Sequence, residues 1–314
     1  MTNEATPAAP GFFARAGGAV LFLSASLFAL MGVQVKALTT LLPPGERLPD
    51  MQVTFTRFAF GLIVMIALAA LGLVRLRSER PLGLLLRGLF GTVAISLYFY
   101  SITHGELTKG TLLTYTYLIF APLFSALWLR EWPTRSAFMA LATATAGIVL
   151  VMNPDFSHVS GGDVAGLGSG IFSGMAITTI RDLRRTEAAP VIFFSLCLCG
   201  TIAVGAMLAL VALGVVGGVA APRVPHASAF LLLIGVGLTS TAGQLILTWG
   251  FRYTSTALGS LISVTTVPLS ALAGVLFFGE RLHWNTLAGA LLILAAGAYL
   301  SLHEVSAKRR QVVS

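Results

Sequence analysis

Long apolar stretches separated by short polar segments follow one another along almost the whole chain. A hydrocarbon core of about 30 Å is crossed by about 20 apolar residues in helical form, and each helix satisfies its own backbone polar groups there. The pattern therefore predicts an all-α membrane protein with ten transmembrane helices. The predicted spans are residues 17–41, 52–74, 82–103, 110–129, 136–152, 164–180, 189–214, 228–250, 256–278 and 284–302.

The composition supports this class. Hydrophobic residues make up 56% of the chain and charged residues only 10%, against about 25% charged residues in soluble domains. These values exclude a water-soluble enzyme. The first 16 residues are polar and rich in alanine and proline, and we interpret them as a short tail before a retained first helix.

The basic residues are distributed unevenly between the predicted loops. Of the 20 Lys and Arg residues, 14 fall on the side of the two termini and four on the opposite side. The positive-inside rule then places both termini in the cytoplasm of a multi-pass inner (plasma) membrane protein. The formal charge of +8 thus reflects topology, so we expect the lipid bilayer and no nucleic acid as a partner.

The two halves of the chain contain similar segments. Residues 107–112 precede an apolar helix with Pro122, and residues 255–260 precede one with Pro268. Five spans in each half would run in opposite senses, an arrangement that recurs in secondary transporters. The predicted organisation is a cytoplasmic tail (1–16), a first five-helix repeat (17–152), an external connecting loop (153–163), a second five-helix repeat (164–302) and a cytoplasmic tail (303–314).

Motifs in the two halves extend this similarity. Each half has a proline-containing helix, a turn with a glutamate and a helix that closes on glycine: Pro122, Glu131 and Gly147, then Pro268, Glu280 and Gly297. With Lys36, Arg57-Phe58 and Gly162-Asp163, this order resembles the EamA-type branch of the drug/metabolite transporter superfamily. The resemblance implies a ten-helix carrier whose central cavity is lined mainly by spans 1, 3, 4, 6, 8 and 9. It implies no particular substrate.

Two cations, Lys36 and Arg57, fall within predicted spans, each about six residues or roughly 9 Å from the outer boundary. Such residues usually face a cavity or a partner, since insertion costs at least about 2.5–3.5 kcal/mol. One interpretation is a cationic clamp for a carboxylate or phosphate of the substrate. The other is that both snorkel or bind carbonyls of a neighbouring helix, with Arg57 paired to an acid such as Glu106.

All 12 carboxylates are predicted in loops or at helix ends, so none would neutralise these cations within a span. A proton relay is not visible either. Facilitated diffusion or exchange is therefore favoured over proton coupling.

Polar side chains recur at helical spacing on several spans and are candidates to line a substrate cavity. They suit an organic ligand with an apolar body and polar handles, although hydrogen bonding between helices explains any single one equally well. The candidate substrate-binding residues, besides Lys36 and Arg57, are Ser96, Tyr98, Tyr100, Thr111, Tyr115, Thr241, Gln244, Thr248, Ser260 and Ser263.

Pro122 and Pro268 are candidate hinges near the middle of spans 4 and 9. Each proline removes a donor and would free the carbonyl four residues earlier, on Leu118 and Val264. A simple packing kink is the alternative, and a kink also makes a hinge.

Other features have structural interpretations. Glycines at four-residue spacing in span 6, Gly166, Gly170 and Gly174, predict close helix packing. Cys197 and Cys199 lie on different helix faces and are expected to pack rather than to bridge. Asp163 follows His158 at the spacing of some acyltransferases, but a helix-capping role is simpler.

The sequence thus predicts a secondary transporter that moves a small organic metabolite, amino-acid-like or related, with export favoured and alternating access as the mechanism. Uptake of a nucleoside-like metabolite or vitamin stays open, as does a non-transporting membrane scaffold. We expect no enzymatic activity, no cofactor and no metal site, because the loops hold no phosphate cradle, nucleophile triad or Cys/His cluster. A homodimer is compatible with the sequence.

Overall fold

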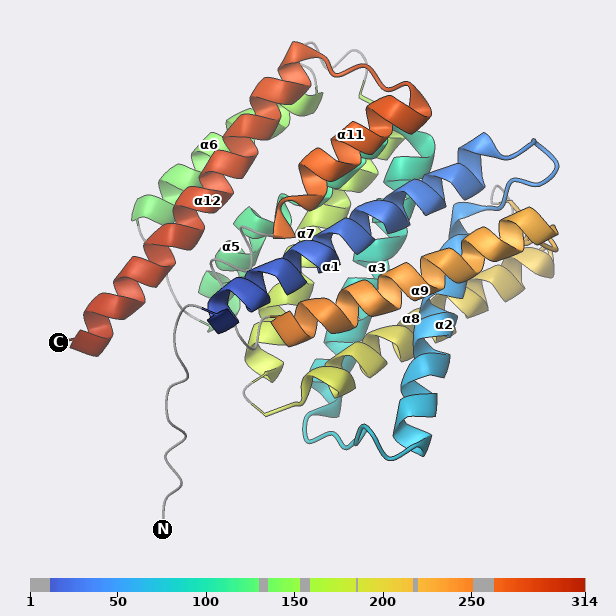
Figure 1. Cartoon of the computed structure of the whole chain (residues 1–314), viewed down its shortest axis with the longest axis horizontal. Helices are drawn as coiled ribbons and strands as arrows, with labels where there is room; N and C mark the ends of the chain where they lie inside the picture. The colour runs from blue at the N-terminus through green and yellow to red at the C-terminus, as the bar shows by residue number, and fades with distance from the viewer. Residues whose placement is uncertain are drawn as a thin grey trace.

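The computed structural model describes residues 12–129, 135–152, 159–184, 186–216, 220–250 and 263–313, and every regular element in these ranges is helical. Figure 1 shows the arrangement. The elements are α1 (Phe12–Lys36), the π-helical turn η1 (Ala37–Leu41), α2 (Asp50–Ala70), α3 (Pro81–His104), α4 (Leu107–Thr114), α5 (Tyr117–Leu129), α6 (Arg135–Met152), α7 (Gly161–Leu183), α8 (Ala189–Ala212), α9 (Ala227–Gly250), α11 (Thr266–Phe278) and α12 (Trp284–Val313). The predicted all-helical class is confirmed.

Six described helices are long and apolar enough to cross a membrane by length and composition. They are Ala19–Leu41, Asp50–Ala70, Pro81–His104, Gly161–Leu183, Ala189–Ala212 and Ala227–Leu247. Shorter apolar helices cover Ala142–Val151, Thr266–Phe278 and Trp284–Ala296. The ten-span count and the two inverted repeats, with their boundaries, stay predictions.

The predicted span 110–129 is not one continuous helix, because α4 ends at Thr114 and α5 begins at Tyr117. At this break the Thr116 hydroxyl donates to the Leu113 carbonyl at 2.6 Å. Before α11, the Thr266 hydroxyl likewise donates to the Ser263 carbonyl, at 2.9 Å. A threonine hydroxyl competes in this way with the helical bonding pattern, so each break stands a few residues before a proline rather than at it.

Pro268 does not leave an open carbonyl. The Val264 carbonyl accepts a hydrogen bond from the Val267 amide at 2.9 Å, so the prediction that Pro268 frees this group is wrong. A bond over three residues replaces the one over four that the proline removes, which is how short 3₁₀ turns satisfy helix ends. The side chain of Pro122 lies outside the described residues.

Helix packing depends on glycine at several close approaches. A Cβ added to Gly166 or Gly174 of α7 would come within 3.0 Å of Ser101 or Phe120, and one at Gly170 would clash with Thr116. The predicted packing role of this glycine face is confirmed, and it brings α7 against the α4–α5 break. α6 and α12 lie side by side (Figure 1), and a Cβ at Gly147 would lie 2.8 Å from the Gly289 carbonyl oxygen.

The start of α7 is capped as predicted. The Ser160 hydroxyl accepts from the Asp163 amide at 3.1 Å, while the Asp163 carboxylate accepts from the Ser160 amide at 3.0 Å. This reciprocal capping box accounts for Asp163 without a catalytic role.

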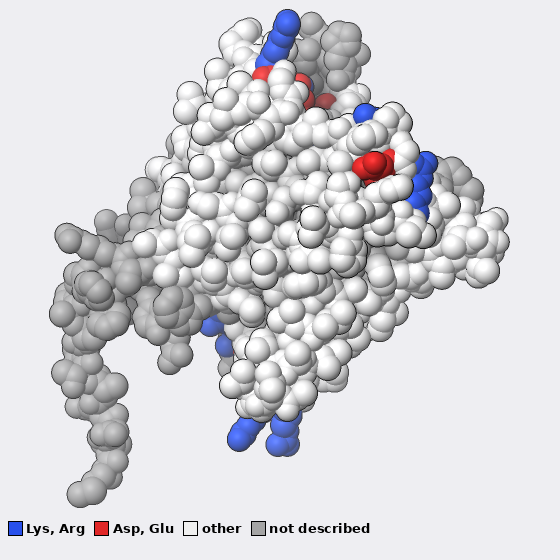
Figure 2. All heavy atoms as spheres, turned by 45° about the vertical axis from the view of Figure 1, so that its right-hand side comes forward, with Lys and Arg blue, Asp and Glu red and all other residues white. Residues whose placement is uncertain are grey.

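The surface has the polarity of a membrane protein. Figure 2 shows Lys and Arg side chains at two opposite ends of the molecule and a wide uncharged surface between them. Many large apolar side chains are exposed, among them Ile63, Ile202, Phe277 and Leu291. Soluble monomers rarely expose so much contiguous apolar surface, so this belt fits contact with lipid and a multi-pass membrane protein.

Candidate functional site

Arg57 lies inside the bundle on α2, seven residues or about 10 Å from the start of that helix. Only 7% of it is exposed, and its guanidinium lies 5.6 and 5.7 Å from the ring centroids of Phe58 and Phe99. Its Nη1 has no hydrogen-bond partner, and within the described ranges no carboxylate pairs with it. The side chain therefore does not snorkel to the surface in this conformation.

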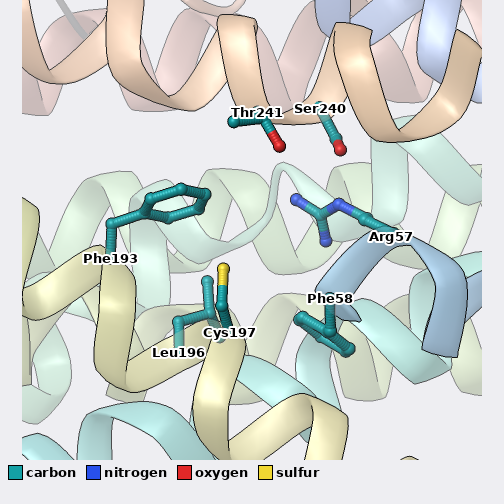
Figure 3. Close-up of a pocket in the computed structure, with 7 residues that line it drawn as sticks. All are labelled: Arg57, Phe58, Phe193, Leu196, Cys197, Ser240 and Thr241. Carbon is teal, nitrogen blue, oxygen red and sulfur yellow. The ribbon is translucent and has the colours of Figure 1, made fainter. Parts of the chain in front are cut away.

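The guanidinium projects into a cavity between α2, α8 and α9 (Figure 3). These helices correspond to the predicted spans 2, 7 and 8, so of the six spans that the resemblance implies for a central cavity only span 8 borders this one. The cavity has an interior volume of about 10 Å³, about the space of one water molecule and far below the roughly 300–1,000 Å³ of pockets for drug-sized ligands. In this conformation it is therefore too small to admit a substrate. Its lining residues are Arg57, Phe58, Phe193, Leu196, Cys197, Ser240 and Thr241.

The polar groups of the cavity other than Arg57 differ in their bonding. Ser240 donates to the Gly237 carbonyl at 3.1 Å, whereas the buried Thr241 hydroxyl has no partner in the described structure. Cys197 is a buried free thiol. Gly61, one turn beyond Arg57, gives these groups space, because a Cβ there would lie 2.7 Å from the Cys197 sulfur. Unpaired donors thus converge on one small volume.

A second arginine, Arg87, belongs to the same region and was not predicted as a site residue. It lies on α3, is 6% exposed, and its Nε and Nη1 have no partner in the described structure. Its Nη1 lies beside Gly91 together with the side chain of Leu196, which lines the cavity. Its guanidinium occupies the space over Gly91, where a Cβ would clash with Nη1.

The sequence contained a signal for Arg87 that our assignment overlooked. Arg87 was counted with the cytoplasmic cations, although it lies five residues inside the predicted span 82–103. Residues four apart lie on the same helix face, and a glycine four residues later leaves the space that the Arg87 guanidinium occupies. The position of Arg87 inside a predicted span, together with the glycine four residues later, identifies it as a candidate site residue, whereas its charge alone does not.

Lys36 has a partner that sequence reasoning did not predict. Its ammonium forms an ion pair with Glu280 at 2.5 Å and donates to the Gly105 carbonyl at 2.9 Å. Both side chains of the pair are more than nine-tenths buried. The expectation that no carboxylate neutralises Lys36 is therefore wrong, because the turn after α11 folds back against the end of α1.

Glu280 also binds the start of α4. Its carboxylate accepts from the backbone amides of Leu107 and Thr108 at 2.5 and 3.1 Å and from the Thr108 hydroxyl at 2.7 Å. Burial raises the pKa of Glu280, but the bonds from Lys36 and Thr108 outweigh it, and the pKa is lowered from 4.5. An anion at the N-terminus of a helix is favourable in itself.

A second carboxylate has the same role at the opposite end of α3. Glu187 accepts from the Ser78 hydroxyl and from the amides of Glu79 and Arg80 at 3.1, 2.8 and 2.7 Å. Burial raises the pKa of Glu187, yet these bonds outweigh it and the pKa is lowered from 4.5. Arg80 also pairs with Asp182 at 2.8 Å. An acid from the second half of the chain thus binds the segment before α3 (Glu187), and another binds the start of α4, which follows α3 (Glu280).

The other predicted site residues are spread over several places. The Tyr98 and Thr111 hydroxyls lie 3.3 Å apart and are buried. The Tyr115 and Tyr117 rings are tilted against each other, with centroids 5.4 Å apart. Tyr100 is 40% exposed and stacks on His104, so it lies away from the Arg57 cavity.

Of the polar candidates, only Thr241 joins Arg57 at the described cavity. Ser96 and Gln244 are half-buried and Ser263 is buried, all elsewhere. Ser260 and the Thr248 side chain lie outside the described residues. Glu106 lies 3.9 Å from Lys109 rather than beside Arg57. The hinge role of Pro122 and Pro268 stays a prediction.

Within the described ranges no three His, Cys, Asp or Glu side chains come together as metal ligands. The chemistry of the Arg57 cavity is hydrogen-bond donation by guanidinium and hydroxyl groups. Such a site is able to hold and orient an anionic group, and it presents no arrangement of nucleophile and base.

The fold and this site together define a multi-pass helical membrane protein with a polar cavity buried between its helices. Comparison with known proteins gives the family. The model of the EamA-like transporter family matches residues 15–153 and again residues 160–302, so the chain belongs to that family.

Characterised relatives are transporters by name. The chain is 29% identical to the pseudopaline exporter CntI of Pseudomonas aeruginosa over 91% of this chain and 96% of that protein. It is 22% identical to the riboflavin transporter of Vibrio cholerae, over 84% and 87% of the two chains. A solved crystal structure covers 92% of this chain and 96% of its own with a TM-score of 0.58 at 21% identity, which supports the shared fold alone.

Proposed function

We propose that this protein is a secondary transporter that moves a small organic metabolite across the inner membrane by alternating access, in the outward direction. The observation that carries the proposal is the buried cavity with its unpaired Arg57, in a chain that belongs to a transporter family. An unpaired buried charge is costly and serves no purpose in a scaffold protein. In a carrier, the substrate binds such a group and satisfies its hydrogen bonds. Outward transport is supported by the likeness to the pseudopaline exporter.

The contacts at the two ends of α3 support alternating access. Glu280 and Glu187, both from the second half, bind segments of the first half at opposite ends of this helix. With both sets of bonds made and a cavity of only about 10 Å³, we interpret this conformation as a closed state. Transport would require that one set of bonds opens while the other holds.

Uptake is the second candidate, favoured by the likeness to the riboflavin transporter. The two directions and the scaffold alternative are separated by one experiment. The purified protein is screened for thermal stabilisation by a metabolite library, and each stabilising compound is then tested in proteoliposomes for transport. Comparison of a deletion strain with its parent for accumulation of that compound gives the direction. A protein that transports none of its stabilising compounds would contradict the proposal.

A topology prediction follows from the charge asymmetry. A reporter fused after Ser314 is expected to be cytoplasmic, and one inserted near Ser160 external, because the basic segments are retained inside. The measurement is paired alkaline phosphatase and green fluorescent protein fusions. An external C-terminal reporter would overturn the ten-span assignment.

A further inference from the structure

Two arginines share a feature that packing does not explain. Both Arg57 and Arg87 are more than nine-tenths buried, and both have guanidinium nitrogens without a hydrogen-bond partner in the described structure. Buried polar groups are almost always bonded, and buried charges are almost always paired. Lys36 follows this rule, because its ammonium forms an ion pair with Glu280. The two arginines therefore differ from the other buried cation of the same bundle.

Both arginines lie near Leu196, which forms part of the cavity wall. Arg57 extends into the cavity between Cys197 on one side and Ser240 and Thr241 on the other (Figure 3). Arg87 reaches the same wall from α3, because a Cβ on Gly91 would lie within 3 Å of both the Arg87 Nη1 and the side chain of Leu196, which lines the cavity. Within the described ranges no ion pair neutralises either arginine. Like charges in a low-dielectric interior repel, and an anion would convert this repulsion to attraction.

The sequence near both arginines keeps this volume open. Gly91 leaves space for the Arg87 guanidinium, and Gly61 leaves space beside Cys197 and Thr241. The unpartnered Thr241 hydroxyl adds a further donor. Phe58, Phe193 and Leu196 form the apolar part of the wall. An anionic oxygen group attached to a hydrocarbon body matches this mixture of donors and apolar surface.

We propose that Arg57 and Arg87 together bind the carboxylate of the transported metabolite, so that the substrate class is an organic carboxylate. This inference rests on the proposed transport function and adds Arg87 as a substrate-binding residue. A guanidinium binds a carboxylate through two parallel hydrogen bonds, a geometry that an ammonium does not provide. The apolar walls favour a singly charged carboxylate over a doubly charged phosphate ester.

Cys197 offers a direct test, because this thiol lines the cavity together with Arg57. In a Cys199→Ser background, the protein in nanodiscs is treated with two thiol reagents of similar size. These are the anionic 2-sulfonatoethyl methanethiosulfonate and the cationic 2-trimethylammonioethyl methanethiosulfonate. The rate at which each reagent modifies Cys197 is divided by the rate at which the same reagent modifies a free thiol in solution. Effects on the thiol itself act on both reagents and cancel in the ratio.

The expected result is a preference of at least about 10-fold for the anionic reagent, the lower end of the contribution of charged hydrogen bonds. Arg57→Gln and Arg87→Gln should each reduce the ratio severalfold. Arg80→Gln should leave the ratio of rates unchanged. Arg80 lies at the start of α3, the helix that holds Arg87, but its side chain pairs with Asp182 near the end of α7. Phenylacetate should slow the modification of Cys197, and the uncharged phenylacetamide should not.

Equal rates for the two reagents, or a ratio that neither glutamine variant changes, would overturn the proposal. Failure of both reagents to reach Cys197 in protein that transports in proteoliposomes would also overturn it, because the binding site must open to water during transport. Stronger protection by phenyl phosphate than by phenylacetate would overturn the carboxylate class. The labelling requires no transport, so its failure is distinct from that of the proposed function. Proteoliposomes that transport without a charge preference would refute the site alone.

Discussion

Replacement of Arg57 or Arg87 by methionine is expected to raise the thermal stability of the empty protein while it abolishes carboxylate binding. Each arginine places an unsatisfied donor in the interior, and relief of one such group is worth about 1–3 kcal/mol. Methionine fills a similar elongated space without a polar group. Functional sites commonly retain strain of this kind at the expense of stability.

The measurement is the unfolding temperature in nanodiscs with and without phenylacetate, for both variants and for the parent. Phenylacetate should stabilise the parent and neither methionine variant. The matched control is Lys36→Met, which leaves Glu280 buried without its partner and should lower stability instead. If both arginine variants were destabilised like Lys36→Met, the guanidinium groups would be structural and the binding site would be refuted.

The sequence predicted the class of this fold because the class depends on composition and length of apolar runs. It did not predict where helices break. Proline was taken as the cause in span 110–129, yet the break lies at Tyr115 and Thr116, where a threonine hydroxyl competes for a backbone carbonyl. The Thr116 side chain fits there because Gly170 of the neighbouring helix α7 has no side chain. The sequence of one span does not contain this information about its neighbour.

The candidate site was predicted in part for a similar reason. Arg57 was identified because an arginine inside a span is conspicuous, and Thr241 because it shares a helix face with other polar residues. Arg87 was missed because a boundary cation was counted by topology, not by the space that Gly91 leaves beside it. The partner of Lys36 was missed because Glu280 is 244 residues away in sequence. Position within a span reveals a charge, but only packing reveals whether it is paired.

These contacts separate the buried cations into two kinds. Lys36 is neutralised by Glu280 and connects α1, α4 and the turn after α11. Arg57 and Arg87 lack such a partner in the described structure and face a cavity. A clamp of Lys36 with Arg57, which the sequence suggested, would require the ion pair to open first. We therefore propose that Lys36, through Glu280, holds this end of the bundle closed, and that the two arginines bind the substrate.

The second large expected effect is a loss of stability when the Lys36–Glu280 ion pair is broken. Glu280→Gln removes the partner of a buried ammonium, a change that typically destabilises by about 3–5 kcal/mol. Because both side chains are less than a tenth exposed, solvent screens the pair little. Lys36→Met combined with Glu280→Gln should recover part of the loss, since no charge then stays buried alone. Lys109→Gln is the matched control, because its pair with Glu106 spans 3.9 Å at partly exposed side chains and should contribute less than about 1 kcal/mol.

The effect also has a defined dependence on pH. The pKa of Glu280 is lowered from 4.5 in the folded protein, so its contribution to stability is fully present above 4.5. The contribution is lost as the pH falls below that value through the folded pKa, because protonation then opposes folding. The unfolding temperature of the parent, measured from pH 7 to pH 3, should therefore fall more steeply than that of Glu280→Gln. Glu187→Gln should retain most of the fall, because Glu280 still titrates in that variant. Parallel curves for the parent and Glu280→Gln would show that the Lys36–Glu280 pair does not hold this end of the bundle closed.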